Sequence, residues 1–74
     1  MASDLSDDAV AWLARFAVAI GQPAPSTDEI EALLALAGAA AHASHRQSAP
    51  VACWLAAQAG LSPSEALAAA ESIT

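Results

Sequence analysis

The stretch STDEIEALLALAGAAAHASHR, residues 26–46, decides the fold. Three acidic residues near its beginning suit the positive end of a helix, and the residues that follow are almost all apolar. One face of the resulting helix carries Ile30, Leu33, Leu34, Ala37 and Ala41. Further leucine and alanine residues leave it apolar nearly all round, which is typical of a buried helix. We therefore predict a central helix over residues 27–46.

Gly38 lies in the middle of this predicted helix. A glycine in a helix interior costs about 1 kcal/mol relative to alanine, so its presence asks for a reason. A glycine lets another backbone come close, because it has no side chain. The sequence thus predicts a close approach of a neighbouring element at Gly38.

Turn and capping residues predict three more helices, over residues 7–20, 50–59 and 63–73. Ser6 or Asp7 can cap the first of them, and Gly21 can end it. The apolar residues between follow the 3.6-residue helical period.

The last two helices are marked in the same way. Pro50 suits the first position of the third helix, and Ser62 and Glu65 have the spacing of a capping box at the start of the fourth. No alternating run is long enough for a strand. The prediction is an all-α fold, a small bundle of four short helices that forms a single domain over residues 1–74.

Composition limits the possible partners. Apolar residues make up 57% of the 74 residues, but 23 residues are alanine, so the core is modest. A net charge of −6 with only two arginines and no lysine argues against binding to nucleic acid or to an anionic membrane. No apolar run is long enough to span a membrane, and Met1–Asp4 lacks the positive charge of a signal peptide. The lone Cys53 favours a reducing compartment. We expect a soluble, cytoplasmic protein.

One cluster has some potential for chemistry. His42, His45 and Arg46 are expected in the last turn of the second helix, where cationic groups complement the helix dipole. They are also weak candidates for holding an anion or a cofactor, together with free N–H groups at the start of the third helix. A metal site that adds Cys53 is the less favoured interpretation, since no second cysteine or strong zinc spacing is present. No metal and no cofactor is therefore predicted.

No catalytic residues are predicted. Ser44, Ser48 and Cys53 lie near histidines in the sequence, but no nucleophile elbow or oxyanion motif accompanies them. The carboxylates gather at helix starts, where capping accounts for them, and there is no glycine-rich phosphate loop. The chain is not expected to be an enzyme.

The two tryptophans are the largest apolar side chains. Trp12 lies on the same helix face as Phe16, which predicts a place in the core. Trp54 lies beside Gln58 and is turned partly away from Val51 and Leu55, so it is either packed, which is the favoured interpretation, or half exposed at an interface. Trp54 and Gln58 are the interface candidates.

Several of these residues together resemble a known family. The segments Leu33–Ala37, Ala41–His42, His45–Arg46 and Ala49–Pro50, with Leu55 after them, are similar to a small actinobacterial helical domain of unknown function. That family has a Trp-Leu pair in its first helix, here Trp12 and Leu13, and an Arg-x-x-Ala-Pro turn, here Arg46 to Pro50. The resemblance spans about residues 10–60.

The resemblance implies a function that the residues alone do not. Members of that family occur alone or fused to molybdopterin-guanine dinucleotide biosynthesis proteins, which implies an accessory role near molybdenum-cofactor maturation. The fourth helix departs from the Gly-rich end usual in that family, and no nucleotidyltransferase signature is present. Two hypotheses follow: a non-catalytic accessory or protein-interaction module that binds a partner or itself, and an anion- or cofactor-binding domain that uses the turn with His42, His45 and Arg46.

Overall fold

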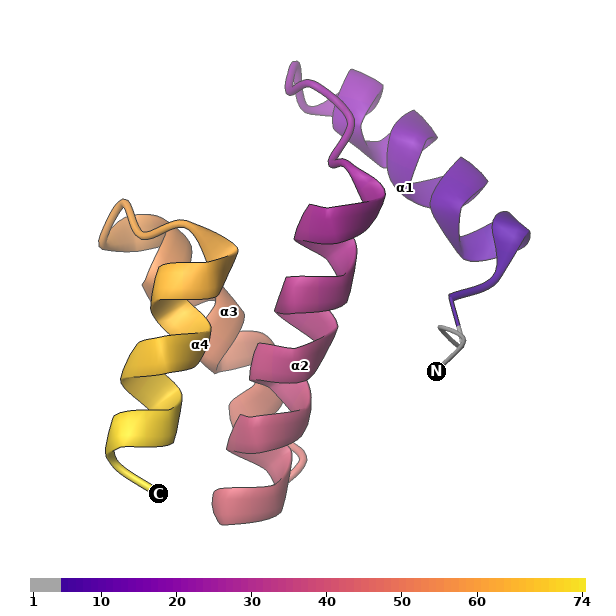
Figure 1. The fold of residues 1–74 in the computed structure, drawn as a ribbon. Coiled ribbons are helices and arrows are strands. Elements are labelled where there is room, and N and C mark those ends of the chain that lie inside the picture. The colour runs from indigo at the N-terminus through magenta and orange to yellow at the C-terminus, as the bar shows by residue number, and fades with distance from the viewer. Residues whose placement is uncertain (1–4) are drawn as a thin grey trace. The chain divides into compact units, whose positions relative to one another are not determined.

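The computed structural model describes residues 5–74, which form four helices and no strand. The helices are α1 (Asp7–Ala19), α2 (Thr27–Ala43), α3 (Ser48–Gln58) and α4 (Pro63–Ser72) (Figure 1). The all-α prediction is confirmed. The prediction made from Met1–Asp4 concerns residues outside the described part of the chain.

Serine side chains begin three of the four helices. The Ser6 hydroxyl accepts a hydrogen bond from the Ala9 N–H at 3.0 Å at the start of α1. At the start of α4, Ser62 and Glu65 form the predicted capping box, with each side chain accepting the other residue's N–H. An equivalent pair that was not predicted, Ser26 and Glu29, begins α2 at distances of 3.1 and 2.8 Å. These bonds satisfy N–H groups that have no partner inside a helix.

Two glycines end helices α1 and α3 in the same way. Gly21 and Gly60 have φ angles of +73° and +75°, which L side chains rarely adopt. The N–H of Gly21 donates to the Val18 carbonyl, and the next N–H, of Gln22, donates to the Ala17 carbonyl. This is the Schellman arrangement, and Gly60 repeats it. The prediction that Gly21 ends the first helix is confirmed.

The end of α2 differs from the prediction. The helix stops at Ala43, three residues before the predicted end, so His45 and Arg46 lie in the turn that follows rather than in the last helical turn. The reason is a reverse turn in which the N–H groups of Ser48 and Ala49 already donate to the His45 and Arg46 carbonyls. As a result α3 begins two residues early, and Pro50 is its third residue rather than its first.

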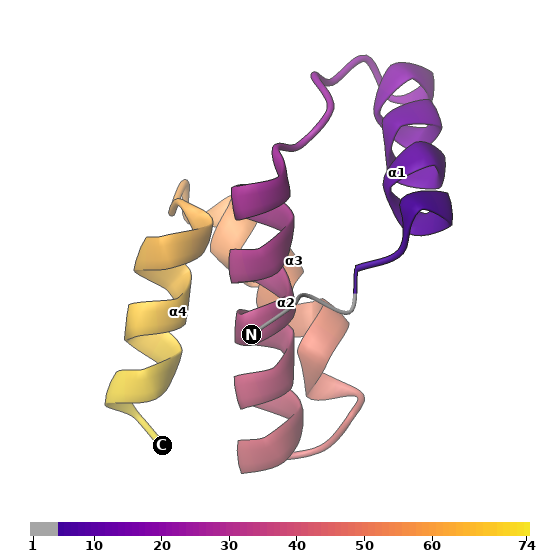
Figure 2. The same cartoon turned by 45° about the vertical axis from the view of Figure 1, so that its right-hand side comes forward.

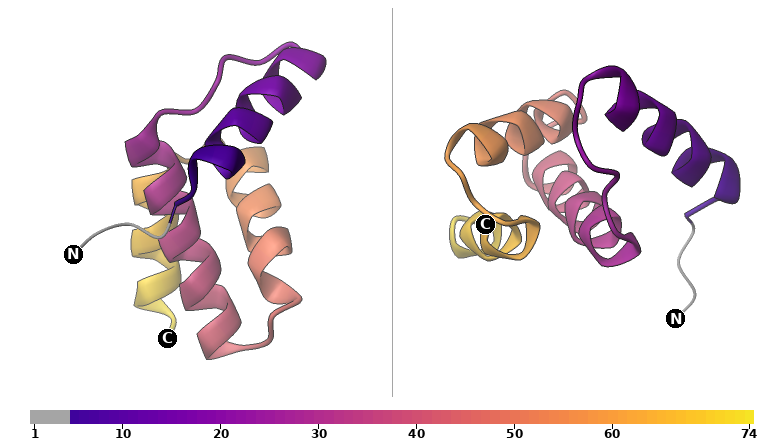
Figure 3. Two further views of the ribbon diagram at one scale, coloured as in Figure 1. Left: turned by 90° about the vertical axis from the view of Figure 1, so that its right-hand side faces the viewer. Right: turned by 90° about the horizontal axis from the view of Figure 1, so that it is seen from above.

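The chain divides into two compact units, Met1–Glu31 and Ala32–Thr74, and the boundary falls within α2. In the second unit, residues 32–43 of α2 lie with α3 and α4, and successive helices run in opposite directions (Figure 2; Figure 3). Leu36 and Ala66 are buried there. In the first unit, Ala17 of α1 and Ile30 of α2 are buried.

Two expectations for α2, the burial of the face that carries Leu34 and the close approach at Gly38, were wrong. Leu34, which was predicted on the buried face, is half exposed. No described atom outside the helix backbone lies within 4 Å of the position that a Cβ atom on Gly38 would occupy. The described part of the chain therefore contains no close approach at Gly38.

Candidate functional site

Helix α3 packs against α2 through its smallest side chains. The Sγ atom of Cys53 lies 4.0 Å from the Leu33 carbonyl oxygen in α2, and Cys53 is half-buried. Ala49, Ala52 and Ala56, which lie on the same side of α3, are also half-buried. Small side chains at these positions let the two helices come close, and they define the inner face of α3.

The other side of α3 carries large apolar side chains that remain in solvent. Val51, Trp54 and Leu55 are 55%, 60% and 57% exposed. They fall within a sector of about 100° of the helix, and Leu55 lies about 160° from Cys53 at 100° per residue. Gln58 is exposed in the same sector. We call Val51, Trp54, Leu55 and Gln58 the outer face of α3.

This result corrects the favoured interpretation of Trp54. Packing was preferred, but the structure leaves more than half of the indole side chain exposed. Both interface candidates, Trp54 and Gln58, are accessible to a partner. The exposure of Val51 and Leu55 was not predicted. Residues 47–64 contain no charged side chain, so the sequence offers no polar residue to mark which side of this helix faces solvent.

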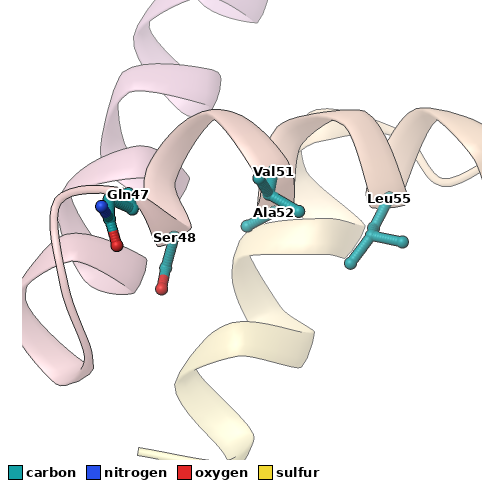
Figure 4. Close-up of a pocket in the computed structure, with 5 residues that line it drawn as sticks. All are labelled: Gln47, Ser48, Val51, Ala52 and Leu55. Carbon is teal, nitrogen blue, oxygen red and sulfur yellow. The ribbon is translucent and has the colours of Figure 1, made fainter.

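Two shallow hollows adjoin the outer face. One, of about 340 Å³, is lined by Gln47, Ser48, Val51, Ala52 and Leu55, which project from one side of α3 and the turn before it (Figure 4). The other, of about 460 Å³, lies between α3 and α4 and reaches Leu36, Leu61 and Ile73. Ala52 and Leu55 line both hollows, so Leu55 forms a ridge between them. The outer face of α3 thus carries both projecting apolar side chains and hollows beside them.

The three candidates for holding an anion lie at the end of α2 and just after it: His42 is in the last turn of the helix, and His45 and Arg46 are in the turn that follows. His42, His45 and Arg46 are all exposed. Among residues 32–74, the acids offer the Arg46 guanidinium no ion-pair partner. A hydrogen bond that was not predicted spans the turn: the Ser48 hydroxyl donates to the Ser44 hydroxyl at 3.0 Å.

The backbone donors expected beside this cluster are already in use. The N–H of Ser48 donates to the His45 carbonyl at 2.8 Å, and that of Ala49 donates to the Arg46 carbonyl at 3.2 Å. Pro50, the next residue, has no N–H. The start of α3 therefore offers an anion fewer donors than an ordinary helix N-terminus does. Across residues 5–74, no three His, Cys, Asp or Glu side chains come together as a potential metal site.

A second exposed apolar feature lies on α1. The rings of Trp12 and Phe16 stack with their centroids 5.2 Å apart and their planes 12° from parallel. Both side chains are about half exposed, so the prediction of a core position for Trp12 was wrong. An exposed stack of this kind retains favourable ring contact without burial.

The chain was compared with known protein families. Residues 4–74 match the model of a domain of unknown function, DUF6457. The chain belongs to this family. No curated protein matches it, and no solved structure does. The match confirms the resemblance to a small domain of unknown function.

The DUF6457 match is longer than the resemblance suggested. It extends beyond residues 10–60 at both ends and includes α4, which was taken as a departure from the family pattern. Within the DUF6457 chain, Trp12 and Leu13 lie on α1, and the Arg46–Pro50 turn leads into α3. Among the described residues of the DUF6457 chain, no helix is long and apolar enough to cross a membrane.

Proposed function

We propose that this DUF6457 chain is a small non-catalytic module that acts by binding a protein. The observation that carries the proposal is the outer face of α3, where Val51, Trp54 and Leu55 are each more than half exposed. A small soluble domain gains stability by covering such side chains, and tryptophan is among the residues that contribute most at interfaces. Two hollows adjoin the outer face, so this surface is contoured as well as apolar.

The roles of the carboxylates support a non-catalytic function. Glu29 and Glu65 accept hydrogen bonds from the backbone N–H groups of Ser26 and Ser62 at 2.8 Å. Asp7 and Asp8 lie in the first turn of α1, and Asp28 lies in the first turn of α2. These acids stabilise helix starts, where negative charge complements the dipole.

The resemblance to domains fused to molybdopterin-guanine dinucleotide biosynthesis proteins suggests where the module works. We extend the proposal to an accessory role in molybdenum-cofactor maturation inside the cytoplasm. Deletion of the chain is then expected to lower the cellular content of mature cofactor, measured after its release from molybdoenzymes. An unchanged content would remove this extension and leave the binding function in place.

The experiment that tests the binding function compares two baits. Tagged wild-type chain and Trp54→Glu chain capture proteins from the native cell, and quantitative mass spectrometry compares the bound proteins. We expect partners that the wild type retains and Trp54→Glu loses, because a buried carboxylate without a partner weakens an apolar interface strongly. Arg46→Gln is the control, since Arg46 lies outside the outer face. Identical capture by all three baits would contradict the proposal.

The second hypothesis keeps one supporting observation. His42 at the end of α2, and His45 and Arg46 in the turn after it, present exposed ionisable groups on a chain with a net charge of −6. A phosphate or a similar anion there would raise the melting temperature. Thermal-shift measurements with phosphate, nucleotides and molybdate test this, with Arg46→Gln as the control. The geometry favours protein binding, because two backbone donors of this turn are already occupied.

A further inference from the structure

We propose that the partner of the outer face of α3 is a second copy of this chain, and that two copies pair α3 against α3 about a two-fold axis. This inference rests on the proposed binding function and names its partner. It starts from the division of α3 into an inner face of small side chains toward α2 and an outer face whose large apolar side chains are more than half exposed.

Charge selects the place where two copies can meet. The chain carries a net charge of −6, so two copies repel each other over most of their surface. Each of the other three helices carries acids, and α3 carries no charged side chain. The uncharged stretch extends beyond the helix, over residues 47–64. Contact through α3 therefore brings two acidic chains together where this helix places no charge opposite its copy.

The shape of the surface also suits pairing with itself. In a two-fold interface the same patch lies on both sides, so it has to carry both the projections and the hollows that receive them. The outer face has Trp54 and Leu55 as projections, and the hollows on either side of Leu55 measure about 340 and 460 Å³. Hollows of this size are large enough to accept a large side chain.

The available area agrees with a dimer of moderate affinity. Leu61 and Ile73 extend the exposed apolar surface along the larger hollow. With Val51, Trp54 and Leu55 they expose roughly 500 Å² of mainly apolar surface per copy, taking a large side chain as 150–250 Å². A standard interface buries about 800 Å² per partner, of which about 60% is apolar. The patch therefore supplies the apolar part of one such interface.

Sedimentation velocity over low-micromolar to submillimolar concentrations tests the proposal with a matched pair of variants. Val51→Glu places a carboxylate on the outer face, while Val18→Glu makes the same change on α1, where Val18 is 80% exposed. The acid at position 51 also lies in the second turn of α3, near its positive end, so the helix should tolerate it. Circular dichroism is used to check that both variants keep the helical content of the wild type.

We expect the wild type to dimerise with rising concentration. Val51→Glu should weaken dimerisation at least about tenfold, because two-fold symmetry places the change in the interface twice. Val18→Glu should change it less than about twofold, within the usual effect of an exposed substitution. Dimerisation should also strengthen slightly with added salt, which screens the repulsion between the acidic copies. A second variant, Leu55→Gln, should weaken dimerisation in the same direction as Val51→Glu.

Three results would overturn the proposal. The first is a wild type that stays monomeric at every concentration and captures a different protein through Trp54, which would leave the binding function intact. The second is a monomer that captures nothing and whose Trp54 fluorescence, measured in a Trp12→Phe background, is protected from quenchers. That face would then be covered within the same chain, and the binding function would fail too. The third is an equal loss of dimerisation in Val51→Glu and Val18→Glu.

Discussion

The Sγ atom of Cys53 lies 4.0 Å from the backbone carbonyl oxygen of Leu33, so the thiol marks the line along which α3 contacts α2. The thiol is half-buried among alanines and behaves as a small apolar group with a weak donor. A larger side chain at this position would have to displace this contact. The contact therefore limits which residues position 53 tolerates.

Two substitutions at Cys53 should separate the effect of side-chain size on stability from the effect of the thiol group. Cys53→Ala removes only the sulfur and should lower the free energy of unfolding by less than about 1 kcal/mol. Cys53→Leu adds volume against the Leu33 backbone and should lower it by about 1–3 kcal/mol. Urea unfolding followed by circular dichroism measures both. An equal and small effect of the two changes would mean that α2 and α3 are less closely packed than the structure shows.

Replacing Gly38 by alanine should stabilise the protein. The position is helical and no described atom outside the helix backbone lies within 4 Å of the new Cβ, so the gain in helix propensity is about 0.5–1 kcal/mol. Gly60→Ala is the control and should lower the stability of the protein, because the φ of +75° at Gly60 strains any L side chain. Thermal unfolding of both variants gives the comparison. A destabilised Gly38→Ala would show that something does pack against this glycine in solution.

Local signals predicted most helix boundaries because the contacts that set them join residues three to five positions apart. The Ser62–Glu65 capping box and the turn at Gly21 are of this kind, and both were predicted. The Ser26–Glu29 box has the same spacing and could have been found by the same rule. The end of α2 was misplaced because no glycine or proline occurs between Gly38 and Pro50, and the reverse turn there depends on carbonyl acceptors that the sequence does not reveal.

The outer face of α3 could be predicted only in part. Trp54 and Gln58 were identified as interface candidates from their place on the helix. The exposure of Val51 and Leu55 could not be predicted, because helical periodicity shows which residues share a side and not which side is covered. The same limit explains Trp12 and Phe16, whose shared face was predicted correctly but is half exposed.

The capping box of α4 should make stability depend on pH. The backbone N–H of Ser62, and then its side chain, lower the pKa of Glu65 below its ordinary value. A carboxylate with a depressed folded-state pKa stabilises the folded state above its unfolded-state pKa, and this contribution is lost as the pH falls through the folded-state value. Glu65→Gln should therefore reduce the loss of stability between neutral pH and about pH 3. Unfolding of the wild type and Glu65→Gln at both ends of that range isolates this group from the other acids. Parallel curves for the two proteins would contradict the assignment.

Arg46 provides the sharpest separation between a structural role and a functional one. The residue is exposed, lies outside α2 and has no ion-pair partner among the acids of residues 32–74. Arg46→Gln should therefore change the free energy of unfolding by less than about 0.5 kcal/mol, as for an exposed position without a partner. It should also leave binding through the outer face of α3 unchanged, which capture experiments measure beside Trp54→Glu. Severe unfolding would mean that Arg46 is buried and paired in solution. Loss of capture in Arg46→Gln, with capture retained in Trp54→Glu, would move the recognition site from the outer face of α3 to the turn before it.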